Sequence, residues 1–196
     1  QHQTVNEPDK IPQSLGVYYA SGKQYLEKNQ LDSAIANFQR AKVAADLQQN
    51  WNLELQATFE LAICHDRKGS LKRAEELYSE SFELAHASAD SNWIAKVFKG
   101  KADIRYRFGD FAEAQKNCEI ALEICERQDD SLQIDCHVRL GAIYSDLGSL
   151  DVSLGHYLTA LRLLERWPAP PDRADPSGRG PAASAPHASD VRFPPA

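Results

Sequence analysis

The sequence predicts an all-α protein, an α-solenoid of four helix–turn–helix repeats with eight helices. The first observation that predicts this fold is a short sequence motif that recurs around Leu31, Leu71, Phe111 and Leu150, at steps of 40, 40 and 39 residues. The second is that apolar residues between these points recur every three or four positions, as on one face of a helix. A fixed period of this size is typical of stacked repeats rather than of a single globular core.

Each repeat supplies two helices. We expect them at residues 14–28 and 32–48, 52–68 and 71–87, 91–108 and 111–127, and 131–147 and 151–166. Gly69, Gly109 and Gly148 follow the first helix of their pairs, where glycine ends a helix in the left-handed conformation at low cost. Because one or two residues remain for the turn, the paired helices must be antiparallel neighbours.

The residues at fixed positions of the pairs resemble the tetratricopeptide repeat. Pair one supplies Gly22, Tyr25, Leu31, Ala34, Phe38 and Ala41, and pair four supplies Gly141, Tyr144, Gly148, Leu150, Tyr157 and Ala160. Four residues depart from that pattern. His65, Arg105 and Cys118 stand at aromatic positions, and Ser153 stands where alanine is usual. The resemblance covers about residues 14–166 and implies a right-handed solenoid that binds other proteins.

The period of 40 residues exceeds the 34 of the ordinary repeat. This long form resembles the repeats of scaffold proteins such as the LGN and rapsyn families. It also resembles bacterial peptide-pheromone receptors and the sensor segments of bacterial signalling proteins. The period alone does not choose between scaffold and sensor.

Composition divides the chain into three parts. We expect a polar lead-in over residues 1–13, a repeat domain over 14–166 and a disordered tail over 167–196, because eight of the ten prolines lie after Trp167. The repeats run over about 14–50, 51–89, 90–129 and 130–166. The tail is either a plain extension, a segment foreign to the repeats or a proline-rich ligand for another domain.

Several classes of function are disfavoured. A net charge of −6 argues against a nucleic-acid partner, and no run approaches the roughly 20 apolar residues of a membrane helix. The sequence contains no catalytic, cofactor or metal motif, so we expect no enzyme and no cofactor. Four cysteines within helical patterns favour free thiols in a reducing, cytoplasmic compartment.

The candidate site is the concave groove. In such a solenoid the first helix of each pair lines this face, and the inward positions of the repeat carry over to Tyr19, Lys23, Phe59, Ile63, Arg67, Lys96, Lys99, Asp103, Tyr106, Arg107 and Val138. Basic and flat apolar residues together suit a peptide with acidic residues and an apolar anchor. The cations are equally compatible with pairing to nearby carboxylates.

We therefore predict a scaffold or adaptor that holds a partner peptide in this groove without catalysis. The alternative is a regulatory sensor or oligomerisation segment of a larger signalling protein. The last helix carries Leu158, Leu161, Leu163 and Leu164, where a solenoid usually has a polar cap. Another repeat, another chain or a folded-back tail would have to cover its outer face, and self-association through this uncapped helix is one expectation.

Overall fold

The computed structural model describes residues 15–125 and 130–166. This part of the chain is all α-helical, as predicted, and its eight helices are α1 (Leu15–Glu27), α2 (Leu31–Leu47), α3 (Trp51–Arg67), α4 (Leu71–Ala87), α5 (Ser91–Arg107), α6 (Phe111–Ile124), α7 (Asp130–Asp146) and α8 (Leu150–Arg166). The lead-in and the tail that the sequence suggested lie outside the described residues.

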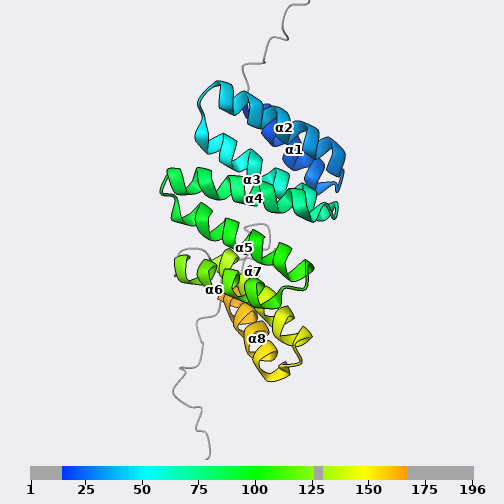
Figure 1. Ribbon diagram of the computed structural model, residues 1–196, viewed down its shortest axis with the longest axis vertical. Helices are drawn as coiled ribbons and strands as arrows, with labels where there is room; N and C mark the ends of the chain where they lie inside the picture. Colours follow the sequence, from blue (N-terminus) through cyan, green and yellow to red (C-terminus); the bar gives the residue numbers. More distant parts are fainter. Residues whose placement is uncertain (1–14, 126–129, 167–196) are drawn as a thin grey trace, which may run out of the picture. The chain divides into compact units, whose positions relative to one another are not determined.

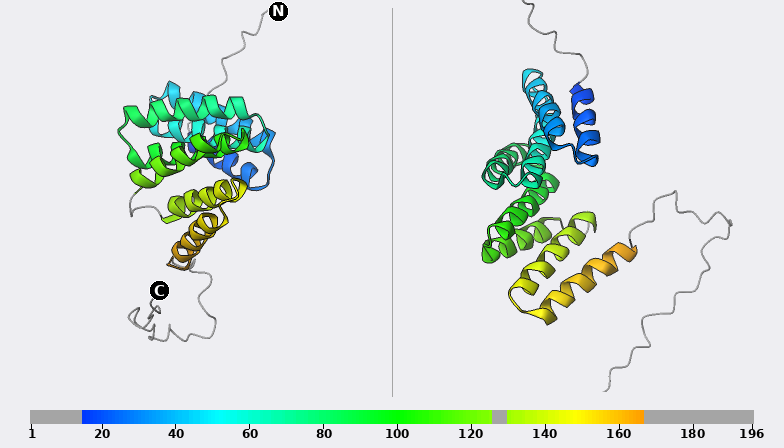
Figure 2. Two further views of the ribbon diagram at one scale, coloured as in Figure 1. Left: turned by 60° about the horizontal axis from the view of Figure 1, so that its bottom comes forward. Right: turned by 90° about the vertical axis from the view of Figure 1, so that its right-hand side faces the viewer.

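The helices form four helix–turn–helix pairs (Figures 1 and 2). Each packs against the next one along the chain. In addition, α3 packs against α5, and α5 packs against α7, so the first helices of successive pairs form one continuous face. None of the helices in the described ranges has both the length and the apolar character needed to cross a bilayer.

Three-residue turns within the pairs use left-handed backbone. Gly69, Gly109 and Gly148 have φ between 77° and 81°, and Asn29 takes the same position in the first pair with φ of 56°. After α3, the Gly69 N–H donates to the Asp66 carbonyl at 2.8 Å. This bond occupies a carbonyl that the end of the helix leaves free. It requires left-handed backbone at the residue after the helix, which glycine adopts at low cost, and glycine therefore recurs at this point of the repeat.

Helix pairs are held together by aromatic rings seated on small residues. A Cβ placed on Gly22 would lie 2.6 Å from the Phe38 ring, and one on Gly141 would lie 2.8 Å from the Tyr157 ring. Tyr78 of α4 covers Gly100 of the next pair in the same way. Each of these glycines therefore admits a ring that any side chain would exclude.

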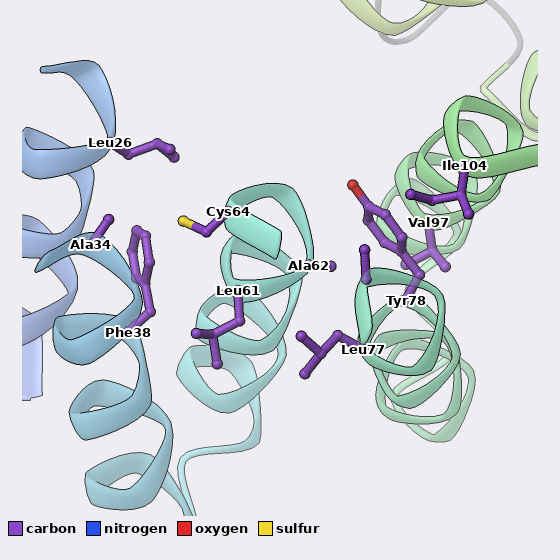
Figure 3. Close-up of a cluster of buried hydrophobic side chains, with 11 residues drawn as sticks. Leu26, Ala34, Phe38, Leu61, Ala62, Cys64, Leu77, Tyr78, Val97 and Ile104 are labelled. Carbon is purple, nitrogen blue, oxygen red and sulfur yellow. The ribbon is translucent and has the colours of Figure 1, made fainter. Parts of the chain in front are cut away.

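The largest buried cluster extends through the first five helices (Figure 3). Phe38 of α2 lies beside Leu61 and Cys64 of α3, and Tyr78 of α4 passes beside Val97 of α5. Burial of these apolar side chains, at about 25 cal/mol per Å² removed from water, stabilises the stack. The second helix of a pair is thus covered by the first helix of the following pair.

Candidate functional site

Helices α3, α5 and α7, together with α4, line a cavity of about 370 Å³. Its lining comprises Phe59, Ile63, Asp66, Arg67, Tyr78, Lys96, Lys99, Gly100, Asp103, Ser131, Leu132 and Asp135. Six predicted groove residues, from Phe59 to Asp103, therefore lie around one cavity. We call it the central cavity. Its volume falls within the roughly 300–1,000 Å³ typical of ligand pockets.

Aromatic residues build the apolar wall of the central cavity. Phe59 of α3 meets Tyr78 edge to face at a centroid distance of 5.5 Å, and it meets Trp93 in the same manner at 5.3 Å. Gly100 leaves room for the Tyr78 ring to reach this wall. Ile63, half-buried one turn along α3, continues it. The wall is rigid and apolar, as a site for an anchoring side chain requires.

Tyr78 and Gly100 line the cavity although the sequence did not indicate them as groove residues. Tyr78 belongs to the packing stripe of its helix, and its side chain reaches across to the next pair. A signal for Gly100 was available, because a glycine inside a helix costs about 1 kcal/mol relative to alanine and often has a packing reason.

Lys99 is held within the protein. Its ammonium donates to Asp103 Oδ2 at 2.8 Å and lies 4.0 Å from Asp135 Oδ2. The other Asp103 oxygen accepts from Arg139 Nε of α7 at 2.7 Å. Burial disfavours the charged ammonium of Lys99, but the Asp103 carboxylate outweighs it and raises the pKa of Lys99 above its ordinary value. The charge of Lys99 is therefore largely neutralised.

Arg67 and Lys96 differ from Lys99. In the described part of the chain neither forms an ion pair. Arg67 is exposed at the end of α3, and the Lys96 ammonium lies 4.8 Å from the centroid of the Trp93 ring. A cation over an indole face retains its charge for a further partner. These two residues are the cations of the central cavity that remain available to a ligand.

Arg107 and Tyr106 connect neighbouring helices instead of lining the central cavity. Arg107 of α5 pairs with Asp66 of α3 and also donates to its carbonyl oxygen. Tyr106 donates to Asp146 Oδ2 at 2.6 Å, and this hydrogen bond raises the pKa of Tyr106. Val138 of α7 is exposed and lies outside the cavity lining.

Tyr19 and Lys23, on α1, both meet Glu60 of α3. Lys23 Nζ lies 2.8 Å from Glu60 Oε1, and the Tyr19 hydroxyl donates to the same oxygen at 3.4 Å. Burial, with the Glu60 charge beside it, raises the pKa of Tyr19 far above its ordinary value. Glu60 Oε2 is buried without a partner in the described residues. These two groove residues thus serve the α1–α3 contact.

The four cysteines, Cys64, Cys118, Cys125 and Cys136, are all buried. Burial, with the nearby Glu60 charge, raises the pKa of Cys64 to about 12, and a hydrogen bond with Cys118 together with burial raises that of Cys136 further. A thiol is nucleophilic only as the thiolate. Within residues 15–125 and 130–166, no three His, Cys, Asp or Glu side chains are grouped to hold a metal ion.

Comparison with known proteins agrees with this architecture. The model of the tetratricopeptide repeat family matches residues 93–166, from the first turn of α5 to the end of α8. No curated protein sequence matches the chain.

Three solved structures share the fold. RapI in its apo form aligns with a TM-score of 0.71 and 16% identity over 82% of this chain, which spans 58% of RapI. BtubC (BKLC) from P. vanneervenii aligns with a TM-score of 0.68 and 17% identity, over 98% of this chain and 74% of BtubC. MamA aligns with a TM-score of 0.56 and 16% identity, over 79% of this chain and 80% of MamA. Identities this low demonstrate a common fold only.

Proposed function

We propose that this protein is a cytoplasmic, non-catalytic scaffold or adaptor that binds a partner peptide in the central cavity. The peptide carries an acidic residue beside an apolar anchor. Tetratricopeptide repeats in general mediate protein–protein interactions, which supports the class of function. The cavity residues support the chemistry of the ligand.

The observation that carries this proposal is the contrast between paired and unpaired cations. The cavity carboxylates are engaged with Lys99, Arg107 and Arg139, whereas Arg67 and Lys96 have no acidic partner in the described chain. The protein as a whole is acidic, with a net charge of −6. Two unpaired cations around an apolar wall are therefore a local exception, and they favour a ligand carboxylate.

Phe59 and Ile63 supply the other half of the interaction. Both are half-buried, so each has apolar surface that a ligand can still cover. Aromatic residues already fixed by packing lose little freedom on binding, which is typical of the residues that dominate interface energies. A Leu or Phe side chain of the peptide would rest here while its acidic neighbour meets Lys96 or Arg67.

A displayed library of random 12-residue peptides tests the proposal on the full chain. We expect enrichment of peptides that combine Asp or Glu with a large apolar residue. Arg67→Glu/Lys96→Glu should lose this enrichment, since it places two carboxylates where the ligand carboxylate binds. Lys28→Glu/Lys72→Glu is the matched control, because it makes the same change of charge at exposed positions outside the cavity lining.

A ten-fold or greater rise in Kd for an enriched peptide on the cavity variant, with the control unchanged, would support the site. Circular dichroism of both variants checks that the helices are intact. If both variants bind the peptide equally weakly, the effect is due to net charge and not to the cavity. If the cavity variant binds as tightly as the wild type, the peptide does not bind in the central cavity.

A further inference from the structure

A second cavity, of about 590 Å³, is lined by residues of α2, α3 and α4. Its lining comprises Gln39, Lys42, Val43, Asp46, Glu54, Leu61, His65, Arg73, Leu77 and Glu80, none of which lines the central cavity. Along α3, Leu61 and His65 alternate with Phe59 and Ile63, and the latter two line the central cavity. Because successive helical residues point about 100° apart, the two cavities lie on different sides of α3.

The equivalent place one repeat later is smaller and more polar. A cavity of about 240 Å³ lies there, and its lining includes Ser79, Lys101, Arg105, Glu113 and Asn117, which follow Gln39, Leu61, His65, Arg73 and Leu77 by 40 residues. Arg105 forms an ion pair with Glu75 in this smaller cavity. The second cavity has Leu61 and Leu77 in place of a lysine and an asparagine. It can therefore accept an apolar side chain, and its volume is within the range of ligand pockets.

Three large apolar residues are exposed beside the second cavity. Val43, Leu47 and Trp51 are 60%, 61% and 52% exposed. Val43 lines the cavity, and Leu47 follows it by one turn at the end of α2. Trp51 begins α3, one turn before the lining residue Glu54. We call Val43, Leu47 and Trp51 the apolar corner.

The later repeats have charged or small residues in place of the apolar corner. The equivalents of Val43 are Glu83, Glu123 and Arg162, those of Leu47 are Ala87, Arg127 and Arg166, and those of Trp51 are Ser91 and Ser131. The repeat therefore does not require large apolar residues at these positions. A group of such residues that remains exposed is typical of a surface that another protein covers.

Two carboxylates of the second cavity have no cationic partner. Asp46 and Glu54 line it, and neither forms an ion pair in the described part of the chain. Burial, together with the charge of Asp46, raises the pKa of Glu54. From residue 43 to residue 66 the sequence contains no Lys or Arg. A cation supplied by a ligand would relieve the repulsion between these two carboxylates.

The cations of this lining are already engaged. Lys42 of α2 pairs with Glu80 of α4, and Arg73 Nη1 lies 2.7 Å from Glu76 Oε2. Arg40, also on α2, lies over an aromatic ring of α1 and is not part of the lining. The second cavity therefore combines apolar surface with unpaired negative charge, whereas the central cavity combines it with unpaired positive charge.

We propose that the second cavity and the apolar corner bind an amphipathic helix of a partner protein that carries Lys or Arg beside its apolar side. Val43 and Leu47 are about 6 Å apart along α2, which matches apolar residues three or four positions apart on a helix lying beside it. One apolar side chain enters the cavity, and its neighbours cover the corner. The unpaired carboxylates disfavour an anionic membrane or a nucleic acid as the ligand.

The displayed library of random 12-residue peptides, applied to the full chain, tests this proposal. We expect a second enriched group, with apolar residues three or four positions apart and at least one Lys or Arg. Fluorescence anisotropy then measures the Kd of an enriched peptide. A proline placed between its apolar residues should abolish binding, because proline breaks the helix. Unchanged binding of the proline peptide would exclude a helical ligand.

Val43→Glu/Leu47→Ala gives the first repeat the residues of the second and should raise the Kd of this peptide about ten-fold or more. The added carboxylate attracts a basic peptide, so the loss reports the missing apolar contact. Val17→Glu/Leu147→Ala is the matched control, since both residues are exposed and lie outside the cavity lining. Asp46→Asn/Glu54→Gln should raise the Kd by about two- to five-fold, as expected for exposed ion pairs.

This proposal does not depend on the peptide site in the central cavity, and the experiment separates the two. Arg67→Glu/Lys96→Glu should bind the basic peptide as the wild type does, and Val43→Glu/Leu47→Ala should still bind acidic peptides. Circular dichroism checks that each variant keeps its helices. The proposal is wrong if no basic, apolar group of peptides is enriched, if Val43→Glu/Leu47→Ala binds as tightly as the wild type, or if the control weakens binding equally.

Discussion

The interior of the helix stack and the wall of its groove are stabilised in different ways. In the interior, rings such as Phe38 and Tyr78 rest on Gly22 and Gly100, and shape decides the contact. Along the groove, ion pairs join residues that are 36 to 41 positions apart on neighbouring first helices. The interior therefore recurs from repeat to repeat, whereas each ion pair in the groove is particular to its own two helices.

The largest effect should come from removing the space under a ring. Gly100→Ala would place a methyl group inside the Tyr78 ring, which is 3% exposed and has little room to move. We expect a loss of about 2 kcal/mol or more in the free energy of unfolding, as for other overpacked cores. Urea denaturation monitored by circular dichroism measures it.

Gly155→Ala is the matched control for this prediction. Gly155 lies within α8, and no neighbouring atom lies within 4 Å of the place that an added methyl group would take. The same substitution should therefore stabilise the protein by about 0.5–1 kcal/mol, through helix propensity alone. If both alanine variants changed stability in the same direction, ring-on-glycine packing would not be what distinguishes Gly100.

The groove wall should be less sensitive to a single substitution. Asp103→Asn removes the carboxylate that joins Lys99 and Arg139 and leaves two cations close together at a half-buried place. We expect a loss of about 1–2 kcal/mol, which is the range for hydrogen bonds to charged groups. Glu76→Gln breaks the exposed pair with Arg73 in an equally conservative way and should cost at most about 0.5 kcal/mol. Equal effects would mean that burial adds nothing to the Asp103 network.

The difference between interior and groove also explains what the sequence could predict. The helix predicted over residues 71–87 has those bounds in α4, and most others begin or end within one residue of their predicted limits. The largest difference is α6, predicted to reach residue 127, which ends at Ile124. Helical periodicity and repeated turns are local properties of the sequence, so a single chain is enough to read them.

The groove was only partly predictable for a related reason. The inward positions carried over from the tetratricopeptide repeat include Phe59, Lys96 and Lys99, and all three line the central cavity. Lys99 and Asp103 are four residues apart on one helix, so their pairing could be read from the sequence, and Lys96 has no carboxylate three or four residues away. The contacts of Asp103 with Arg139 and of Lys99 with Asp135 could not be read in this way, because Arg139 and Asp135 lie on α7. How fully a groove cation is neutralised therefore depends on tertiary contacts as well.

The contact between α7 and α8 combines a ring packed on a glycine, Tyr157 on Gly141, with a polar contact between two histidines. The polar contact should respond to pH. His137 Nδ1 lies 3.0 Å from His156 Nδ1, so one ring must donate and the other accept. Burial lowers the pKa of both, and the neighbouring His156 also lowers that of His137. The unfolded chain therefore binds more protons than the folded one just below about pH 6.5, and stability should fall as the pH drops through that range.

His137→Asn/His156→Asn removes both titrating groups, so unfolding free energies at pH 7.5 and 5.5 should differ less in this variant than in the wild type. We rank this effect last because both rings are half-exposed and water screens their repulsion. An identical pH dependence in the two proteins would show that protonation of this pair does not contribute to the stability of the last repeat.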